Sequence, residues 1–117
     1  MDGCIFCKII TGEIKDSIVK SGKNFIAIKD INPAAEGHTL VIPRQHYANL
    51  LDIPESLGEE LLSFIKEVAS ELINRKLGNG FNIIMNNFSS AGQLVPHAHI
   101  HIIPRKDGDG LRFIVKK

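Results

Sequence analysis

Three histidines at alternate positions, His97, His99 and His101, most strongly limit how this chain can fold. Residues two apart in a β-strand point to the same face, about 6.6 Å apart along the chain. A strand here therefore places all three imidazoles on one face and aliphatic side chains on the other, namely Ala98, Ile100 and Ile102. An antiparallel strand normally has a polar outer face, but Thr, Lys or Glu would be the ordinary choice there. Clustered histidines are typical of functional sites, so this stretch predicts a functional site on a strand.

Composition limits both the size of the fold and its partners. A chain of 117 residues with 44% hydrophobic residues predicts a single domain spanning residues 1–117. Fourteen Lys and Arg residues against thirteen Asp and Glu residues leave a net charge of +1, which does not indicate a nucleic-acid partner. The N-terminus lacks the apolar core of a signal peptide, and no stretch reaches membrane-spanning length. We therefore expect a soluble cytoplasmic protein with no membrane partner.

The hydrophobic pattern predicts an α+β fold with an antiparallel sheet of about five strands. Apolar residues predict a short helix over residues 4–10, and helical periodicity predicts a long one from Pro54 or Glu55 to Leu77. Alternation and turn residues predict strands at 17–21, 24–30, 38–42, 81–86 and 95–105. Residues 87–94 are expected to form a loop, and residues 111–115 to add a short strand or a packed arm.

Two cysteines three positions apart, Cys4 and Cys7, suggest a metal site. Tetrahedral zinc requires four nitrogen or sulfur ligands, and His46 and His97 are the best candidates to complete the set. Such a closed site would be structural. Two alternatives remain open, a pair of small core residues or a redox pair, although the flanking sequence lacks the βαβ context of a thioredoxin-like motif.

Three histidines remain for a catalytic role, namely His38, His99 and His101. A neutral imidazole can attack phosphorus directly, and His99, flanked on both sides, is the natural nucleophile. Its other nitrogen needs a hydrogen-bond acceptor, which a backbone carbonyl of the same strand can supply. His101 and His38 would then donate to phosphate oxygens, together with backbone N–H groups of residues 90–93. Because Gly92 has no side chain, a phosphate could approach the backbone closely there, although glycine is equally typical of an ordinary turn.

Taken together, these residues resemble the histidine triad (HIT) family, whose motif His-φ-His-φ-His-φ-φ is met by residues 97–103. The likeness extends to residues 4–10, 30–33, 37–46 and 91–105, which look like the family's other blocks in their usual order. It is strongest to the Hint branch and its small prokaryotic relatives. The resemblance implies a HIT-like fold and a homodimer whose sheets join across the two-fold axis.

The resemblance also implies a function. It implies a nucleotide hydrolase or transferase acting at the α-phosphate of a nucleoside 5′-monophosphate derivative, of the adenosine phosphoramidate or aminoacyl-adenylate type, through a covalent nucleotidyl-histidine intermediate. His99 would be the nucleophile, and the α-phosphate would be contacted by His38, His101, Asn86, Gly92 and Gln93. Asp30 would accept both ribose hydroxyls, and a purine base would lie in an apolar slot made by Ile5, Phe6, Ile9, Ile28 and Ile31.

Zinc-containing relatives carry their metal ligands at the positions of Cys4, Cys7, His46 and His97, which agrees with the set obtained by counting ligands. The resemblance implies no organic cofactor. One departure concerns Leu94, because many Hint-like relatives have Ser or Thr directly after the Gly-Gln pair. Leucine cannot protonate a leaving group, so hydrolysis of dinucleoside polyphosphates is a second hypothesis. A nucleotide-binding scaffold without turnover is a third. The tail at residues 111–117 matches no pattern of the family.

Overall fold

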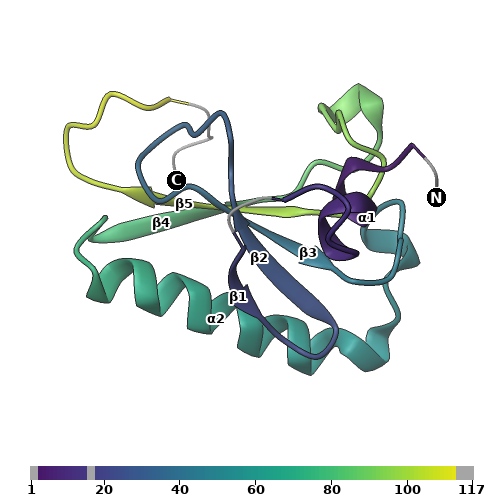
Figure 1. Ribbon diagram of the computed structural model, residues 1–117. Helices are drawn as coiled ribbons and strands as arrows, with labels where there is room; N and C mark the ends of the chain where they lie inside the picture. Colours follow the sequence, from purple (N-terminus) through teal and green to yellow (C-terminus); the bar gives the residue numbers. More distant parts are fainter. Residues whose placement is uncertain (1–2, 16–17, 113–117) are drawn as a thin grey trace.

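The protein is built around one five-stranded antiparallel sheet, seen in a computed structural model that describes residues 3–15 and 18–112 (Figure 1). Its order is β1-β2-β3-β5-β4, with the strands at Ile18–Ser21, Phe25–Lys29, Thr39–Pro43, Gly80–Ile84 and Ile100–Arg105 in chain order. All four neighbouring pairs are antiparallel. The predicted α+β class and the first hairpin are confirmed.

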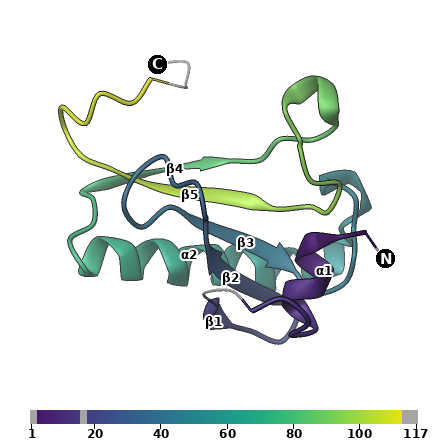
Figure 2. The ribbon, with the colours of Figure 1, turned by 45° about the horizontal axis from the view of Figure 1, so that its top comes forward.

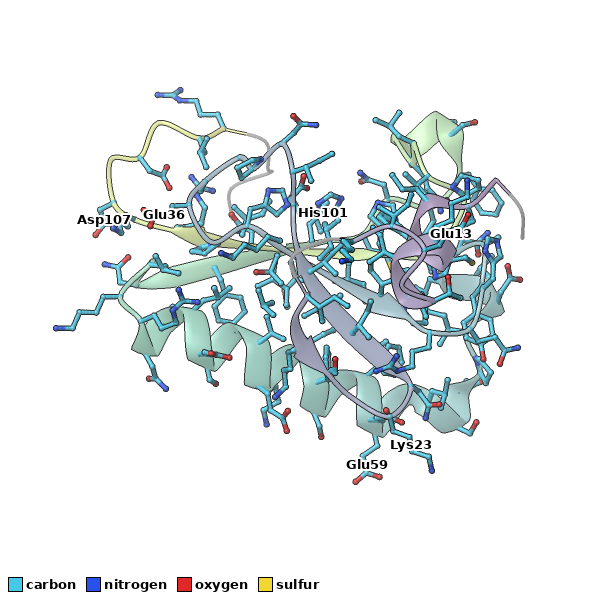
Figure 3. The ribbon with its side chains drawn as sticks, in the orientation of Figure 1. Glu13, Lys23, Glu36, Glu59, His101 and Asp107 are labelled. Carbon is cyan, nitrogen blue, oxygen red and sulfur yellow. The ribbon has the colours of Figure 1, made fainter. Side chains whose placement is uncertain are left out.

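Two helices cover opposite faces of this sheet (Figures 1 and 2). Strand alternation divides the buried residues of β2, β3 and β5 between the faces. The long helix α2, at Gly58–Asn74, packs on a cluster that includes Phe25, Ala27, Val41, Ile100 and Ile102. The short helix α1, at Ile5–Ile10, packs on Ile26, Ile28, Leu40 and Ile42. The α1 face is the one toward which His101 points (Figure 3).

The helix α2 is shorter than its periodicity predicts. Glu55–Leu57 form a separate 3-10 turn after Pro54, so the α-helix begins only at Gly58. At the other end Lys76 adopts a φ of 61°, a left-handed conformation that no α-helix can continue through, and the helix ends at Asn74 before Leu77. The buried residues of α2 are Phe64, Val68, Ala69 and Leu72, which confirms the predicted apolar stripe at helical spacing.

The prediction of one histidine strand over residues 95–105 is wrong at its start, because β5 begins only at Ile100. Pro96 has no N–H to donate to a sheet ladder. The N–H of His97 donates to Val95 O at 2.8 Å, and the N–H of Ala98 donates to Tyr47 O at 2.6 Å. His97 and His99 therefore lie on an irregular segment that enters the strand, and only His101 lies within it.

Two further segments differ from the predictions by more than one residue. Strand β4 ends at Ile84, two residues before the predicted end, which leaves Asn86 in the following loop. Leu111 and Arg112 belong to no helix or strand, and the rest of the predicted strand at 111–115 falls outside the described residues. Within the described part of the chain, neither helix has the length and apolar character needed to cross a membrane.

Candidate active site and metal centre

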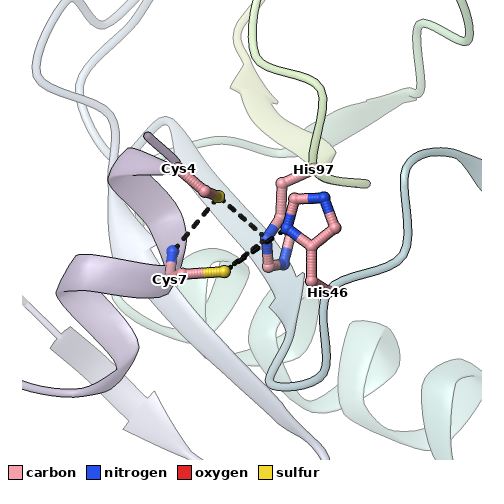
Figure 4. A group of neighbouring side chains, drawn as sticks. All are labelled: Cys4, Cys7, His46 and His97. Atoms are coloured by element: carbon pink, nitrogen blue, oxygen red, sulfur yellow. Dashed lines mark hydrogen bonds between the residues drawn. The ribbon is translucent and has the colours of Figure 1, made fainter. Parts of the chain in front are cut away.

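Cys4, Cys7, His46 and His97 converge on one point (Figure 4). Cys4 caps the N-terminus of α1, Cys7 lies in its first turn, His46 follows β3, and His97 precedes β5. Their ligand atoms all lie within 4.8 Å of one another. Cys4 Sγ is 3.2 Å from His97 Nδ1, and Cys7 Sγ is 3.3 Å from His46 Nδ1. The structure therefore brings together all four residues that the sequence predicts as metal ligands.

The chemistry and spacing of these donors fit zinc. Zinc–ligand bonds of about 2.0–2.3 Å in a tetrahedron put neighbouring ligand atoms about 3.5 Å apart. His97 is fully buried, and its Nε2–H donates to Pro43 O at 2.9 Å, so the lone pair on Nδ1 faces the two sulfur atoms. Burial and the neighbouring Cys4 raise the pKa of the Cys7 thiol. A bound cation would reverse that effect by stabilising the thiolate.

A cavity of about 340 Å³ opens beside this cluster, on the α1 face of the sheet. This volume lies in the usual range for small-molecule sites. One wall is apolar, made by Ile5, Phe6, Ile9, Ile28, Ile31, Leu40 and Val95. Polar residues of the lining are Lys29, Asp30, Asn32, Asn86, His99 and His101, while Gly92 and Leu94 belong to the loop after β4.

The ring of His99 is held in one orientation by the chain that carries it. Its Nδ1 lies 2.8 Å from the carbonyl oxygen of His97, so Nδ1 carries the proton and donates it to that oxygen. The Phe6 ring packs against the imidazole in an edge-on contact, with centroids 5.1 Å apart. Nε2 of His99 is then the nitrogen with a free lone pair. The expected hydrogen bond from His99 to a nearby backbone carbonyl is confirmed.

A second chain of hydrogen bonds orients His101. The N–H of Ala34 donates to His38 Nδ1 at 3.0 Å, so His38 must carry its proton on Nε2. That Nε2–H lies 2.9 Å from His101 Nδ1 and 3.4 Å from a carboxylate oxygen of Asp30. His101 Nδ1 is thereby an acceptor, which leaves its proton on Nε2. Burial, with smaller effects of His99 and His38, lowers the pKa of His101 to about 4, so the ring is neutral near pH 7.

Ten of the residues predicted to bind nucleotide line this single cavity: Ile5, Phe6, Ile9, Ile28, Asp30, Ile31, Asn86, Gly92, His99 and His101. His38 does not line it. Its ring contacts His101 Nδ1 and lines a second hollow with Gly37 and Thr39. Gln93 does not line it either. Its side-chain amide donates to Ala48 O at 2.6 Å and Val95 O at 3.0 Å, which closes the loop.

The loop also differs from the prediction that its backbone N–H groups face an anion. The N–H of Gly92 donates to Ser89 O and that of Gln93 donates to Phe88 O, so both are used inside the loop. Sequence reasoning missed Leu40, Val95 and the Ala34 N–H. The pairing of β2 with β3 places Leu40 beside Ile28, which a predicted hairpin register could have indicated. The Ala34 contact has no sequence signal, because every non-proline residue carries the same N–H group.

The fold and this cavity define a class of small α+β domains with a histidine-lined cavity, and comparison with known proteins identifies the family. The profile of the HIT domain matches residues 11–108, so the chain belongs to the HIT family. It is 49% identical to the uncharacterized HIT-like protein MJ0866 of Methanocaldococcus jannaschii, over 92% of this chain and 82% of the relative. It is 40% identical to the adenosine 5′-monophosphoramidase HNT1 of Candida albicans, over 89% of this chain and 71% of the relative.

A further relative and two solved structures extend the comparison. The chain is 38% identical to the adenylylsulfatase HINT3 of Arabidopsis thaliana, over 92% of its own length and 55% of that protein. A HIT family protein from Bacillus subtilis superposes with a TM-score of 0.90 and 37% identity, covering 98% of this chain and 82% of the other. A zinc-bound histidine triad family protein from Mycobacterium smegmatis superposes with a TM-score of 0.89 and 34% identity, covering 96% of this chain and 81% of the other. These likenesses support the predicted family and HIT-like fold.

Proposed function

We propose that this protein hydrolyses nucleoside 5′-monophosphate derivatives at the α-phosphate, using His99 as nucleophile. The observation that carries the proposal is the 2.8 Å hydrogen bond from His99 Nδ1 to His97 O inside a cavity of nucleotide size. It orients the ring and makes Nδ1 the donor, so that in the neutral imidazole the lone pair lies on Nε2, the form needed for attack on phosphorus. Relatives named as an adenosine 5′-monophosphoramidase and as an adenylylsulfatase support the reaction class.

The cavity suggests how a purine nucleotide would bind. The base would lie against the apolar wall, where Phe6 and the aliphatic residues offer a flat slot without strict donors or acceptors. Asp30 would accept ribose hydroxyls, for which Oδ2 is available while Oδ1 accepts from the N–H of Asn32 at 2.9 Å. The phosphate would lie between His99, His101 and Asn86. His38 would then act through His101 and not on the phosphate itself.

The reaction would take two displacements. His99 Nε2 attacks the α-phosphorus, a P–N bond forms, and the bond from phosphorus to the leaving group breaks with its electron pair on the leaving atom. His101 Nε2–H and the Asn86 amide donate to the non-bridging oxygens as charge develops. Water then attacks phosphorus, and the P–N bond breaks with its electron pair on His99 Nε2. The nucleoside monophosphate is released, and the proton lost by water passes to solvent. The carbonyl of His97 holds the Nδ1 proton throughout, and it stabilises the charged intermediate.

The proposal includes a structural zinc ion held by Cys4, Cys7, His46 and His97. The support is the convergence of two sulfur and two imidazole donors and the zinc-bound relative of known structure. Zinc at this site would tie α1 to the segment that carries His97 and supply no reacting group. No organic cofactor enters the proposed reaction.

We also propose that the protein is a homodimer joined at β4. This strand is at the edge of the sheet, paired with β5 on one side. Phe81 and Ile83 project from it with 44% and 50% of their surfaces exposed. An exposed apolar edge strand is a template for pairing with another strand, and a second copy would extend the sheet across a two-fold axis.

The test is hydrolysis of adenosine 5′-phosphoramidate and of diadenosine tetraphosphate by the wild-type protein and by His99→Ala. We expect His99-dependent release of AMP, and a protein-bound adenylyl group after denaturing quench of the wild type. Preference for diadenosine tetraphosphate would favour the dinucleoside polyphosphate hypothesis. Equal rates for wild type and His99→Ala with both substrates, together with measurable AMP binding, would instead support a non-catalytic nucleotide-binding protein.

A further inference from the structure

Leu94 occupies an unusual place at the edge of the cavity. It is 92% exposed, yet it borders the same space as His99 and Gly92. It comes from the loop between β4 and β5, whereas the apolar wall proposed for the base comes chiefly from α1 and β2. A group leaving from the phosphate on the loop side would therefore meet an aliphatic side chain.

The described residues that line the cavity supply no evident proton donor for that side. They include no Ser, Thr, Tyr or Cys, and the titratable ones are Lys29, Asp30, His99 and His101. Lys29 borders the cavity, but alternation along β2 directs its side chain to the face of Phe25 and Ala27, which pack toward α2, and Lys29 also lines a second hollow beside α2. Ser89 and Ser90 belong to the same loop as Leu94 but are absent from the cavity lining.

The two histidines are equally unsuited to donate a proton. His99 is the nucleophile, so its Nε2 is bonded to phosphorus as the group leaves, and its Nδ1–H donates to His97 O. His101 is neutral near pH 7, because burial lowers its pKa to about 4, and a neutral imidazole N–H is a hydrogen-bond donor but not an effective acid. Both carboxylate oxygens of Asp30 face hydrogen-bond donors, because Oδ1 accepts from the N–H of Asn32 at 2.9 Å and Oδ2 lies 3.4 Å from His38 Nε2.

We propose that Leu94 makes the enzyme selective for mixed anhydrides of a nucleoside 5′-phosphate with a carboxylic, sulfuric or phosphoric acid, and poor toward phosphoramidates. The proposal rests on the function proposed above. When His99 Nε2 attacks an anhydride, the P–O bond breaks and the electron pair leaves on an oxygen that is stable as a carboxylate, sulfate or phosphate anion. With a phosphoramidate the P–N bond breaks, and the departing nitrogen must gain a proton as it leaves.

The experiment compares kcat/KM for adenosine 5′-phosphosulfate, a mixed anhydride, with kcat/KM for adenosine 5′-phosphoramidate. Wild type, Leu94→Ser and Leu94→Ala are measured, each after subtraction of the rate of His99→Ala. We expect wild type to prefer the anhydride by about 100-fold or more, the size of a typical general-acid contribution. Leu94→Ser should reduce this ratio at least about tenfold by raising phosphoramidate turnover, since its hydroxyl can relay a proton. Leu94→Ala, which opens the same space without a hydroxyl, should keep the wild-type preference.

A matched control is Leu51→Ser, because Leu51 is also highly exposed, at 79%, but does not border the cavity. It should retain the wild-type ratio. Comparable kcat/KM for the two substrates in wild type, or identical ratios for Leu94→Ser and Leu94→Ala, would overturn the selectivity proposal while leaving the proposed function intact. Absence of His99-dependent hydrolysis of both substrates would overturn the proposed function, and the selectivity proposal with it.

Discussion

The Nε2 atom of His38 lies 2.9 Å from the Nδ1 atom of His101, and the Ala34 N–H on the far side of His38 sets the direction of that hydrogen bond. This chain of hydrogen bonds, from the Ala34 N–H through His38 to His101, is here called the relay. It orients the imidazole that faces the cavity. The outcome is one fixed tautomer of His101, with the proton on Nε2. A donor aimed at a phosphate oxygen needs no reorganisation when charge develops there.

Replacement of His38 tests this relay. His38→Phe keeps an aromatic ring but removes the donor to His101, so we expect kcat/KM to fall by about 10- to 100-fold, the usual effect of losing an orienting partner. His38→Gln retains a side-chain donor and should recover part of the loss. Nitrogen-15 NMR of the His101 imidazole gives the second measurement. A His101 ring that stays protonated on Nε2 in His38→Phe would contradict the relay.

The lowered pKa of His101 predicts a pH dependence of stability. In the unfolded chain this histidine titrates near 6.5, whereas in the folded protein its pKa is about 4. Between these values the unfolded state binds more protons, so the free energy of unfolding falls as the pH drops from 6.5 to about 4. At about 1.4 kcal/mol per pH unit, this contribution is at most about 3 kcal/mol. His38, whose pKa burial also lowers, acts in the same direction.

Urea denaturation of wild type and His101→Gln between pH 4 and pH 7 measures this contribution. Both proteins carry the same cysteine and histidine cluster, so loss of metal at low pH affects both curves and cancels in the difference. The wild-type curve should therefore be the steeper of the two. Parallel curves would show that His101 does not contribute.

The metal site is expected to support both stability and His99. Zinc bound at Nδ1 of His97 would fix the residue whose carbonyl accepts from His99 Nδ1 at 2.8 Å. We expect one zinc ion per chain by elemental analysis. His46→Gln should reduce the zinc content and lower Tm by about 5 °C or more, since even 1 kcal/mol shifts Tm by several degrees in a domain of this size. Gln45→Ala, at the exposed neighbouring position, should change neither quantity.

The edge strand β4 predicts how the dimer can be broken. Ile83 is half exposed on this strand, so Ile83→Lys introduces a charge where a second copy would pack. We expect a monomer in sedimentation equilibrium, with the wild type a dimer. Lys106→Glu, a charge change on an exposed residue beyond the end of β5, is the control and should stay dimeric. A wild-type monomer at micromolar concentration would refute the proposed assembly.

Ligand counting from the sequence predicted which side chains meet at the metal cluster, whereas the residues that line the cavity were predicted from the resemblance to the HIT family. Cys4 and His97 are far apart in the chain, but their types and the demand of zinc for four donors were enough to pair them. The same reasoning could not predict that His38 lies behind His101. That position depends on a hydrogen bond from the backbone of Ala34, and backbone groups carry no sequence signal.

The start of β5 shows a second limit of the sequence. The alternation at His97, His99 and His101 is the pattern of a strand, yet the first two residues precede it. The N–H of His97 donates to Val95 O, and His97 O accepts from the His99 ring instead of from a neighbouring strand. Sequence periodicity predicts the direction of side chains but not the hydrogen-bond partner of each backbone group. It therefore predicts too long a strand where the residues before the strand hold site side chains.

Phe88 predicts a stabilising substitution in the loop beside the cavity. Its backbone has φ 72° and ψ 154°, a region that essentially only glycine occupies without strain, and its side chain is 54% exposed. Relief of about 1–3 kcal/mol of strain should outweigh the added flexibility of the unfolded chain, which costs about 0.5–1 kcal/mol. Phe88→Gly should therefore raise the free energy of unfolding by about 1 kcal/mol in urea denaturation. Phe88→Ala keeps a Cβ in the same strained conformation and should bring no gain, so a glycine variant less stable than the alanine variant would contradict the assignment of strain to this residue.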